Sequence, residues 1–470
     1  MQALVVGAGI SGLATAWYLQ REAARRERDL DITVLEADDR VGGVINTENV
    51  GGFTCELGPD SFISEKPWAL ALCHELGLEQ RVLGTGQRRR SFIARGHRLH
   101  PIPDGFQMLA PTRLAPFLTT PLFSPLGKLR MGMDLLLPRG GQSSDSGNDE
   151  TLAEFVRRRL GNEALERAAQ PLVGGIYTSD PEKLSLEATM PRFIEMERKH
   201  RSLILGMYKA RRAMAPANTT GPRYDLFVSL ADGMGELPAA LVKALPHGCV
   251  RTGQRVESLR HDGDGYLLGG PGLQLRADAL CLALPSHASG QLTAGIAAEL
   301  TTELNAIDYA STATINLAFA RRDVAHPLDG FGFVVPAVEG RTLLACTFSH
   351  EKFPGRAPSD QVLLRAFAGG AMQPGAALLD DEQLLAAVTH DLSELLGLKG
   401  PPLHVRISRH PRAMAQYGRG HLQRVDRIEK HVEALPGLAL AGNGYRGIGI
   451  PDCVHSAELA AERMAAHLFG

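Results

Sequence analysis

Three glycines near the beginning of the chain have the spacing of a dinucleotide-binding turn. The stretch A-L-V-V-G-A-G-I-S-G at residues 3–12 places Gly7, Gly9 and Gly12 at G-x-G-x-x-G spacing, directly after a short apolar run. In such a turn Gly7 redirects the chain, Gly9 lets the backbone approach a pyrophosphate, and Gly12 lets the following helix pack closely on the strand. The pattern therefore predicts a strand, a tight turn and a helix whose N-terminus faces an anion.

An acidic residue at the end of the second apolar run completes this pattern. Residues 31–35 predict a buried strand, and Glu36 follows 24 positions after Gly12. Its carboxylate can accept hydrogen bonds from ribose hydroxyls, near the expected spacing of ~20 residues. The sequence R-V-G-G follows, in which Arg40 is interpreted either as a charge-assisted donor to a phosphate or as part of a solvated turn. We therefore predict a dinucleotide site.

A glycine-rich passage near the end of the chain indicates which dinucleotide binds. Residues 437–450 read G-L-A-L-A-G-N-G-Y-R-G-I-G-I, which predicts a buried strand and a glycine loop, and Pro451 begins a periodic helix. An isoalloxazine ring that has accepted a hydride is anionic, so a helix N-terminus beside it stabilises the reduced state. The passage therefore favours a flavin over a nicotinamide.

The composition is that of an ordinary globular protein and excludes several classes. The 470 residues suffice for two or three domains, and the net charge of −2 gives no general attraction to nucleic acid. The six cysteines have no C-x-x-C spacing and the N-terminus has no signal pattern, so we expect a reducing, cytoplasmic setting. Cys453, at the start of the last predicted helix, is interpreted as structural. No metal is expected, because the sequence contains no H-E-x-x-H motif or Cys/His cluster.

Two segments between the nucleotide motifs leave alternatives open. The run Arg88, Arg89 and Arg90 is either a solvated turn or a site for substrate carboxylates, which arginine binds through paired hydrogen bonds. Residues 101–138 are apolar, but prolines and basic residues interrupt them too often for a membrane span. They predict a lid over a large hydrophobic ligand, a patch on a bilayer surface, or ordinary helical core.

The remaining elements predict a discontinuous nucleotide-binding domain with two further parts. The predicted fold class combines α/β and α+β, with a Rossmann-type FAD-binding domain formed by residues 1–87, 223–290 and 405–470. Residues 88–222 predict an inserted α-helical, apolar domain. Residues 291–404 predict a β-rich substrate domain, in which an antiparallel sheet would form the floor of a chamber.

Several motifs together resemble the flavin-dependent porphyrinogen oxidases of haem biosynthesis, within the flavin amine oxidase superfamily. The nucleotide motifs, G-A-G-I-S-G with Glu36 and R-V-G-G, are shared by the whole superfamily. The motifs specific to these oxidases are E-L-G-P-D-S-F, A-P-F-L-T-T-P-L-F-S-P-L-G-K, G-G-I-Y-T-S-D-P-E-K-L-S-L, K-H-R-S-L-I-L-G-M, G-F-G-F-V-V-P, F-A-G-G and G-I-G-I-P-D-C. The resemblance covers nearly the whole chain.

The resemblance implies which residues hold the cofactor and the substrate. His410 stands where close relatives carry a tryptophan beside the flavin, and we place it with the cofactor residues. Ser91 falls where protoporphyrinogen-oxidising members place a propionate-binding arginine, which coproporphyrinogen-oxidising relatives also lack. The implied FAD-binding residues are Gly7, Ala8, Gly9, Ile10, Ser11, Gly12, Glu36, Ala37, Arg40, Gly42, Gly43, Val44, Gly58, Pro59, Asp60, Ser61, Val256, His410, Ile448, Gly449 and Ile450. The implied walls of the substrate site, beside the arginine run, are Gly175, Ile176, Leu317 and Phe367.

The reaction implied by the resemblance is the oxygen-dependent oxidation of coproporphyrinogen III to coproporphyrin III, with protoporphyrinogen IX as the alternative substrate. The chemistry centres on the flavin, so we name no catalytic side chain. The expected partners are a porphyrinogen, dioxygen, a membrane surface, a second copy of the chain and a downstream haem-pathway enzyme. The expected location is the cytoplasm, including the inner face of the cell membrane. A flavin amine oxidase and a non-catalytic flavin or porphyrin carrier remain alternatives.

Overall fold

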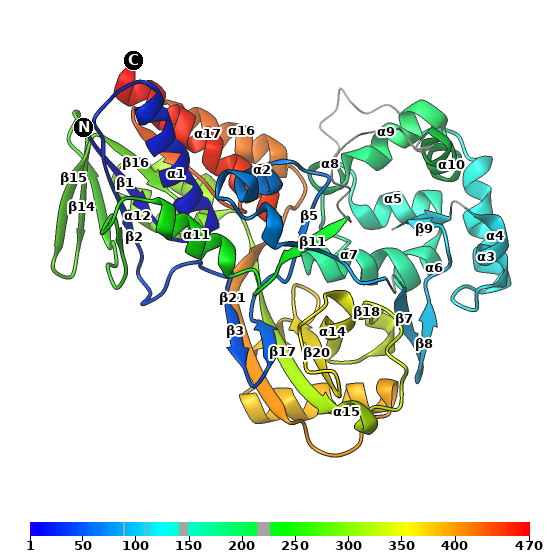
Figure 1. Ribbon diagram of the computed structural model, residues 1–470. Helices are drawn as coiled ribbons and strands as arrows, with labels where there is room; N and C mark the ends of the chain where they lie inside the picture. The colour runs from blue at the N-terminus through cyan, green and yellow to red at the C-terminus, as the bar shows by residue number, and fades with distance from the viewer. Residues whose placement is uncertain (88–89, 108, 112, 141–148, 214–225) are drawn as a thin grey trace. The chain divides into compact units, whose positions relative to one another are not determined.

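The chain divides into two compact units, each built from segments that are far apart in the sequence (Figure 1). Unit 1 comprises residues 1–84, 224–308 and 422–470, and unit 2 comprises residues 85–223 and 309–421. The structure is a computed structural model that describes residues 1–87, 90–107, 109–111, 113–140, 149–213 and 226–470.

The boundaries of the units differ from the division predicted from the sequence by three residues or fewer at two places, and by a whole segment at two others. Residues 405–421 belong to unit 2, because strand β21 (His404–Ala415) pairs with β17 (Tyr309–Ala320). Residues 291–308 belong to unit 1, because helix α13 (Ala298–Asn305) packs on α12 (Ser286–Thr293). The helical insertion and the β-rich segment share unit 2, so their separation into two domains stays a prediction.

The centre of unit 1 is a parallel sheet of five strands in the order β12-β2-β1-β16-β22. Its strands are short apolar runs, such as A-L-V-V at residues 3–6, where no side chain is more than 5% exposed. Strands covered on both faces need continuous apolar sequence, and parallel strands need crossover connections. The five strands are β1 (Gln2–Val6), β2 (Asp31–Leu35), β12 (Val250–Arg251), β16 (Ala279–Leu282) and β22 (Leu438–Leu440).

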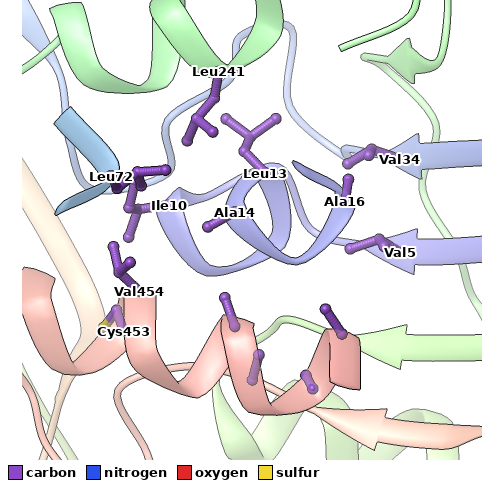
Figure 2. Close-up of a cluster of buried hydrophobic side chains, with 14 of the residues drawn as sticks. Val5, Ile10, Leu13, Ala14, Ala16, Val34, Leu72, Leu241, Cys453 and Val454 are labelled. Carbon is purple, nitrogen blue, oxygen red and sulfur yellow. The ribbon is translucent and has the colours of Figure 1, made fainter. Parts of the chain in front are cut away.

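Two long helices pack against each other beside this sheet. Helices α1 (Ile10–Arg25) and α17 (Ile450–Phe469) carry several fully buried alanines, which let their backbones approach closely. In Figure 2, Leu13 of α1 points toward Leu241 of helix α11 (Glu236–Ala244), and Val454 of α17 belongs to the same apolar cluster. The predicted strand, turn and helix at the beginning of the chain are therefore present, and their buried side chains belong to one continuous apolar core.

Shorter elements complete unit 1. They are β3 (Thr47–Val50), β4 (Phe53–Glu56), β5 (Phe62–Ile63), α2 (Trp68–Glu75), β6 (Val82–Gly84), β11 (Phe227–Leu230), α11 (Glu236–Ala244), β13 (Ser258–His261), β14 (Tyr266–Gly270), β15 (Leu273–Ala277) and α16 (His421–Glu433). Strands β13, β14 and β15 form an antiparallel meander that follows β12 in the chain.

Unit 2 contains a mostly antiparallel sheet of seven strands in the order β21-β17-β20-β19-β18-β7-β8. One face is apolar, where Ile315, Leu317 and Phe319 of β17 pack into a cluster with Leu384 and Val388 of helix α15. The predicted antiparallel strands and the mixed α/β and α+β fold class are therefore present. The other strands and α-helices of this part are β7 (Ser91–Arg95), β8 (Arg98–Pro101), β18 (Gly332–Val334), β19 (Leu343–Phe348), α14 (Ser349–Lys352), β20 (Gln361–Gly369) and α15 (Asp381–Leu396).

A buried ion pair joins the helical elements of unit 2. Arg159 and Asp134 are both 0% exposed, and Arg159 Nε donates to Asp134 Oδ1 at 2.7 Å. Asp134 Oδ2 also accepts from the Ser202 hydroxyl at 2.6 Å and from the Ile204 backbone N–H at 3.0 Å. The helical elements include α3 (Leu114–Thr119), α4 (Pro125–Gly132), the 3-10 helix η2 (Met133–Leu135), α5 (Leu152–Arg159), α6 (Asn162–Ala164), α7 (Gln170–Tyr177), α8 (Leu186–Thr189), α9 (Pro191–His200) and α10 (Leu203–Ala213). None of the described helices has the length and apolar character needed to cross a bilayer.

Candidate functional site

The turn between β1 and α1 leaves no room for side chains at its first and third glycines. Gly7 adopts a φ of +103°, and its N–H donates to the Leu35 carbonyl at 2.7 Å. A Cβ atom on Gly12 would lie 1.8 Å from the Gly7 carbonyl oxygen, whereas a Cβ on Gly9 would meet no protein atom within 4 Å. Gly9 therefore faces open space at the N-terminus of α1, as a backbone that approaches a ligand must.

The R-V-G-G loop lies directly against this turn. The Gly42 N–H donates to the Ala8 carbonyl at 2.8 Å, and a Cβ on Gly43 would lie 3.3 Å from the Gly9 Cα. The exposed Arg40 guanidinium donates to the Gly43 carbonyl at 2.7 Å. Arg40 thus stabilises its own loop in this structure, and its predicted bond to a phosphate stays a prediction.

The Glu36 carboxylate also lies at the glycine turn. Its Oε2 accepts from the Ala8 N–H at 2.7 Å, and its Oε1 accepts from the Asp38 N–H at 3.0 Å. The loop that carries Val256 is tied to the same place, because the Gln254 N–H donates to the Glu36 carbonyl at 2.7 Å. The structure therefore brings together two predicted segments that are separated by more than two hundred residues.

The G-P-D-S turn at residues 58–61 packs on the end of the R-V-G-G loop. A Cβ on Gly58 would lie 1.7 Å from the carbonyl oxygen of Val44, so only glycine fits there. The Asp60 carbonyl accepts from the Ser229 hydroxyl at 2.8 Å. Within unit 1 these contacts join residues 7–12, 36, 42–44 and 58–61 into one continuous surface of backbone groups.

The N-terminus of α17 meets the N-terminus of α1 at this surface. Ile10 and Ile450 are buried in the same cluster, and the Cys453 side chain bonds to the Ser11 hydroxyl. Burial raises the pKa of the Cys453 thiol to about 12, despite that bond, so the thiol stays protonated and the structural interpretation fits. Two helix N-termini therefore lie side by side, and the glycines before each helix carry no side chain that would block a ligand. Their partial positive charges fit the phosphates and the reducible ring of a flavin dinucleotide.

Two contacts that the sequence analysis did not predict hold the start of α17, and with it the preceding glycine loop, in place. Lys66 Nζ lies 2.5 Å from Asp452 Oδ1, and the Trp68 ring stacks on His455 with 4.1 Å between ring centres. Asp452 also fills the space beside Gly447, where a Cβ would lie 2.3 Å from the Asp452 Cγ. The sequence offered only the proximity of Lys66 to the G-P-D-S turn, because pairing with Asp452 depends on tertiary structure.

Unit 2 holds the predicted substrate residues, but not all on one side of the sheet. Phe367 pairs with Thr314 and Ala345, and Val334 pairs with Ala345, so these side chains share one face. Gly175 of α7 lies on that face, because its Cβ position is 3.5 Å from Val334 Cγ1. Ile176, the next residue, is 48% exposed.

Leu317 differs from the prediction that it lines the substrate site. It pairs with Leu364 and is 0% exposed in the apolar cluster on the face that α15 covers. Because side chains alternate along a strand, Leu317 lies on the face opposite to Thr314 and Phe367. It is a core residue.

The other predicted residues of unit 2 are placed as follows. His410 pairs with Thr312 on the face that carries Phe367, and its Nε2 lies 3.4 Å from the Ser408 hydroxyl. Arg90 is exposed and contacts Asp329 at 3.3 Å. Arg88 and Arg89 lie outside the described residues. Within the part of the chain that the structure describes, no three His, Cys, Asp or Glu side chains form a metal site.

Comparison with known proteins identifies the family. A family model described as flavin containing amine oxidoreductase matches residues 10–465. The chain belongs to this family. Its members contain a flavin and catalyse oxidation or reduction, so the prediction of an oxidoreductase with FAD is confirmed, in agreement with the glycine surface of unit 1.

Individual relatives place the chain within the family. The coproporphyrinogen III oxidase of Bacillus subtilis (strain 168) is 36% identical over 472 residues, which cover 99% of this chain and 98% of that protein. Protoporphyrinogen oxidase 2, chloroplastic/mitochondrial, of Arabidopsis thaliana is 27% identical over 99% of this chain and 94% of that protein. A crystal structure from Exiguobacterium sp. 255-15 has a TM-score of 0.86 and 34% identity, and covers 99% of this chain and 98% of that one. The predicted resemblance to porphyrinogen oxidases is therefore confirmed.

Proposed function

We propose that this flavin oxidoreductase oxidises coproporphyrinogen III to coproporphyrin III, with dioxygen as the electron acceptor. The observation that carries the proposal is the 36% sequence identity, over nearly the full length of both chains, to the coproporphyrinogen III oxidase of Bacillus subtilis. The reaction removes six electrons in three two-electron steps and reduces three dioxygen molecules to hydrogen peroxide. The product would serve haem biosynthesis.

When bound, FAD supplies the two-electron acceptor for each step. The chain's own residues act by binding and orientation. The N–H groups at the N-termini of α1 and α17 direct partial positive charge toward anionic groups, and Glu36 accepts hydrogen bonds from a ribose. Phe367, Gly175 and Ile176 provide apolar contact for the macrocycle. Pyrrole protons are lost to solvent, so no side-chain base is proposed.

Protoporphyrinogen IX is the second candidate substrate, favoured by the similarity to the Arabidopsis thaliana protoporphyrinogen oxidase. Ser91 favours the first candidate, because it stands at the start of β7, where the resemblance places a propionate-binding arginine in protoporphyrinogen-oxidising members. The role of Arg88, Arg89 and Arg90 in binding carboxylates stays a prediction.

A side-by-side assay tests the proposed function. The purified holoenzyme is given each porphyrinogen in air, and porphyrin fluorescence is followed. We expect kcat/KM for coproporphyrinogen III to exceed that for protoporphyrinogen IX by about tenfold or more. The reverse preference would establish the second candidate, and turnover of neither substrate would refute a porphyrinogen oxidase.

Contact with a membrane surface is the second part of the proposal. Leu126 and Leu129 of α4 are 78% and 68% exposed, and Leu136, just beyond η2, is 75% exposed. Spacings of three and seven residues place them near one side of a helical segment, as on helices that lie in a bilayer interface. The protein would then work in the cytoplasm at the inner face of the membrane. Self-association and transfer of product to a later haem-pathway enzyme stay predictions.

Substituting two of these leucines should weaken membrane contact without affecting the fold. We expect Leu126→Ser with Leu129→Ser to lower binding to phospholipid vesicles at least about tenfold in a sedimentation assay, because each exposed leucine contributes on the order of 1.5 kcal/mol when buried. Leu378→Ser is the control, since Leu378 is 80% exposed elsewhere in unit 2. Equal binding by the double variant and the control would refute the proposed contact.

A further inference from the structure

The N-terminus of α17 carries partial positive charge in the part of unit 1 that fits the flavin. Helix α17 spans 20 residues, and its N-cap residue, Gly449, has no side chain with which to cap it. The first backbone N–H groups of a helix carry a charge equivalent to about half an elementary charge. This end lies beside the N-terminus of α1, because the Cys453 side chain bonds to the Ser11 hydroxyl. A reduced flavin is anionic, so positive charge at this place favours it.

A carboxylate in the first turn of α17 opposes this charge. Asp452 is the third residue of the helix, and its side chain is only 12% exposed. The carboxylate lies against the glycine loop, since a Cβ on Gly447 would be 2.6 Å from Asp452 Oδ1 and a Cβ on Gly449 would be 3.2 Å from Oδ2. Because a full negative charge exceeds the partial charge of the helix, Asp452 by itself would make this end of α17 negative.

Lys66 supplies the opposite charge. Its Nζ lies 2.5 Å from Asp452 Oδ1, and both residues belong to unit 1. The basic residue of the glycine loop itself, Arg446, is engaged elsewhere, because it is bonded to Asp426 and Glu429 of α16 at 2.8 and 2.6 Å. The pair of Lys66 and Asp452 is neutral, so the partial positive charge of the helix remains.

The two charges act in opposite directions on a titratable side chain next to them. Burial is the main cause that raises the pKa of the Cys453 thiol to about 12. Asp452 raises this pKa further, whereas Lys66 lowers it. A thiol that loses its proton becomes an anion, so Lys66 stabilises negative charge at the start of α17 and Asp452 destabilises it. An anionic flavin at this end of the helix is subject to the same two effects.

Other contacts also hold the start of α17 in place. The Trp68 ring stacks on His455 with 4.1 Å between ring centres, and the Gly442 N–H donates to the Ser456 hydroxyl at 3.2 Å. The Lys66 side chain is 39% exposed, and partly exposed ion pairs usually contribute little to stability. The fold of this region therefore does not depend on Lys66 alone, and the role of its charge is a separate question.

We propose that Lys66 neutralises Asp452 and thereby raises the reduction potential of the bound FAD. Lys66 is a positioning residue, because it acts through Asp452 and not on the reacting atoms. With the carboxylate neutralised, the start of α17 stays positive and favours the reduced flavin, so each transfer of two electrons to FAD becomes more favourable. The inference goes beyond the proposed function, because it concerns the cofactor and holds for whichever substrate the enzyme oxidises.

Anaerobic redox titration of the bound flavin tests the inference. The holoenzyme and its variants are reduced stepwise beside a reference dye, and the flavin absorbance gives the ratio of reduced to oxidised FAD at each potential. We expect Lys66→Met to lower this ratio about tenfold at a fixed potential, which is about 30 mV for a two-electron couple. Asp452→Asn should raise the ratio, because the Lys66 charge is then left without its negative partner.

Two further variants separate the effect of charge from an effect on structure. Lys66→Met combined with Asp452→Asn removes both charges and keeps the shape of the aspartate, so the ratio should return to within about threefold of the wild type. Lys243→Met is the matched control, because Lys243 is an exposed lysine in the last turn of α11, also in unit 1. Its charge is screened by solvent, and the ratio should stay within about twofold of the wild type.

An unchanged ratio in Lys66→Met would overturn the inference, as would a double variant shifted as far as Lys66→Met. Either result would leave the ion pair as a structural contact. If Lys66→Met does not retain FAD, Asp452→Asn decides: a higher proportion of reduced FAD supports the inference, and an unchanged or lower proportion overturns it. Failure of the proposed function is distinguishable, because it is measured by porphyrinogen turnover in the wild type and not by these shifts.

Discussion

Gly12→Ala will give a protein that is markedly less stable and does not hold FAD. The new Cβ would lie 1.8 Å from the Gly7 carbonyl oxygen, which belongs to the backbone and cannot rotate away. The helix must therefore move off the strand, at a cost of about 3 kcal/mol or more in the free energy of unfolding. Thermal unfolding and the flavin absorbance of the purified protein measure the two effects.

Gly9→Ala is the informative control for that variant. Its Cβ meets no protein atom within 4 Å, and the Gly9 φ of −70° suits alanine. The apoprotein should unfold within about 0.5 kcal/mol of the wild type. The affinity for FAD should fall nonetheless, since the methyl group would occupy the space needed by the pyrophosphate. Unchanged FAD affinity in Gly9→Ala would contradict the placement of the cofactor.

Arg159→Met will produce the second large effect, on stability alone. The substitution leaves the Asp134 carboxylate buried at 0% exposure, where it keeps the hydrogen bonds from the Ser202 hydroxyl and the Ile204 N–H but loses its cationic partner. Removing one member of a buried ion pair costs about 3–5 kcal/mol, because the remaining charge stays buried. Urea unfolding monitored by circular dichroism measures the change in the free energy of unfolding.

Arg157→Met is matched to Arg159→Met, two residues away on the same helix. Arg157 forms an exposed ion pair with Glu182, whose side chains are 44% and 48% exposed. Such surface pairs contribute at most about 1 kcal/mol. A loss as large in Arg157→Met as in Arg159→Met would show that the helix, and not the buried pair, is responsible.

The nucleotide site was predictable because its chemistry is local in sequence. The turn at Gly7 to Gly12 depends on residue types at fixed spacing, and strand β1 depends on a continuous apolar run. The predicted structure of that region is therefore confirmed. The contact of Lys66 with Asp452 joins residues 386 positions apart, so nothing nearby in the sequence could indicate it.

The sheet of unit 2 shows why the substrate-facing side chains and the boundary of that unit could not be predicted. Leu317 and Thr314 lie in one strand, and the sequence alone does not decide which face α15 will cover. Strand β21 mixes basic residues with apolar ones and contains Pro411, so it has no continuous apolar run to mark it as part of that sheet. Its assignment to unit 2 follows from pairing with β17.

Anaerobic reduction of the bound flavin tests the central claim most directly. The holoenzyme is mixed with coproporphyrinogen III in the absence of oxygen, and the flavin absorbance is recorded before and after air is admitted. Our account predicts that the flavin absorbance is lost when coproporphyrinogen III is added and returns when air is admitted. Coproporphyrin III fluorescence should then appear. A flavin that stays oxidised with coproporphyrinogen III but is bleached by a primary amine would contradict the account and indicate an amine oxidase.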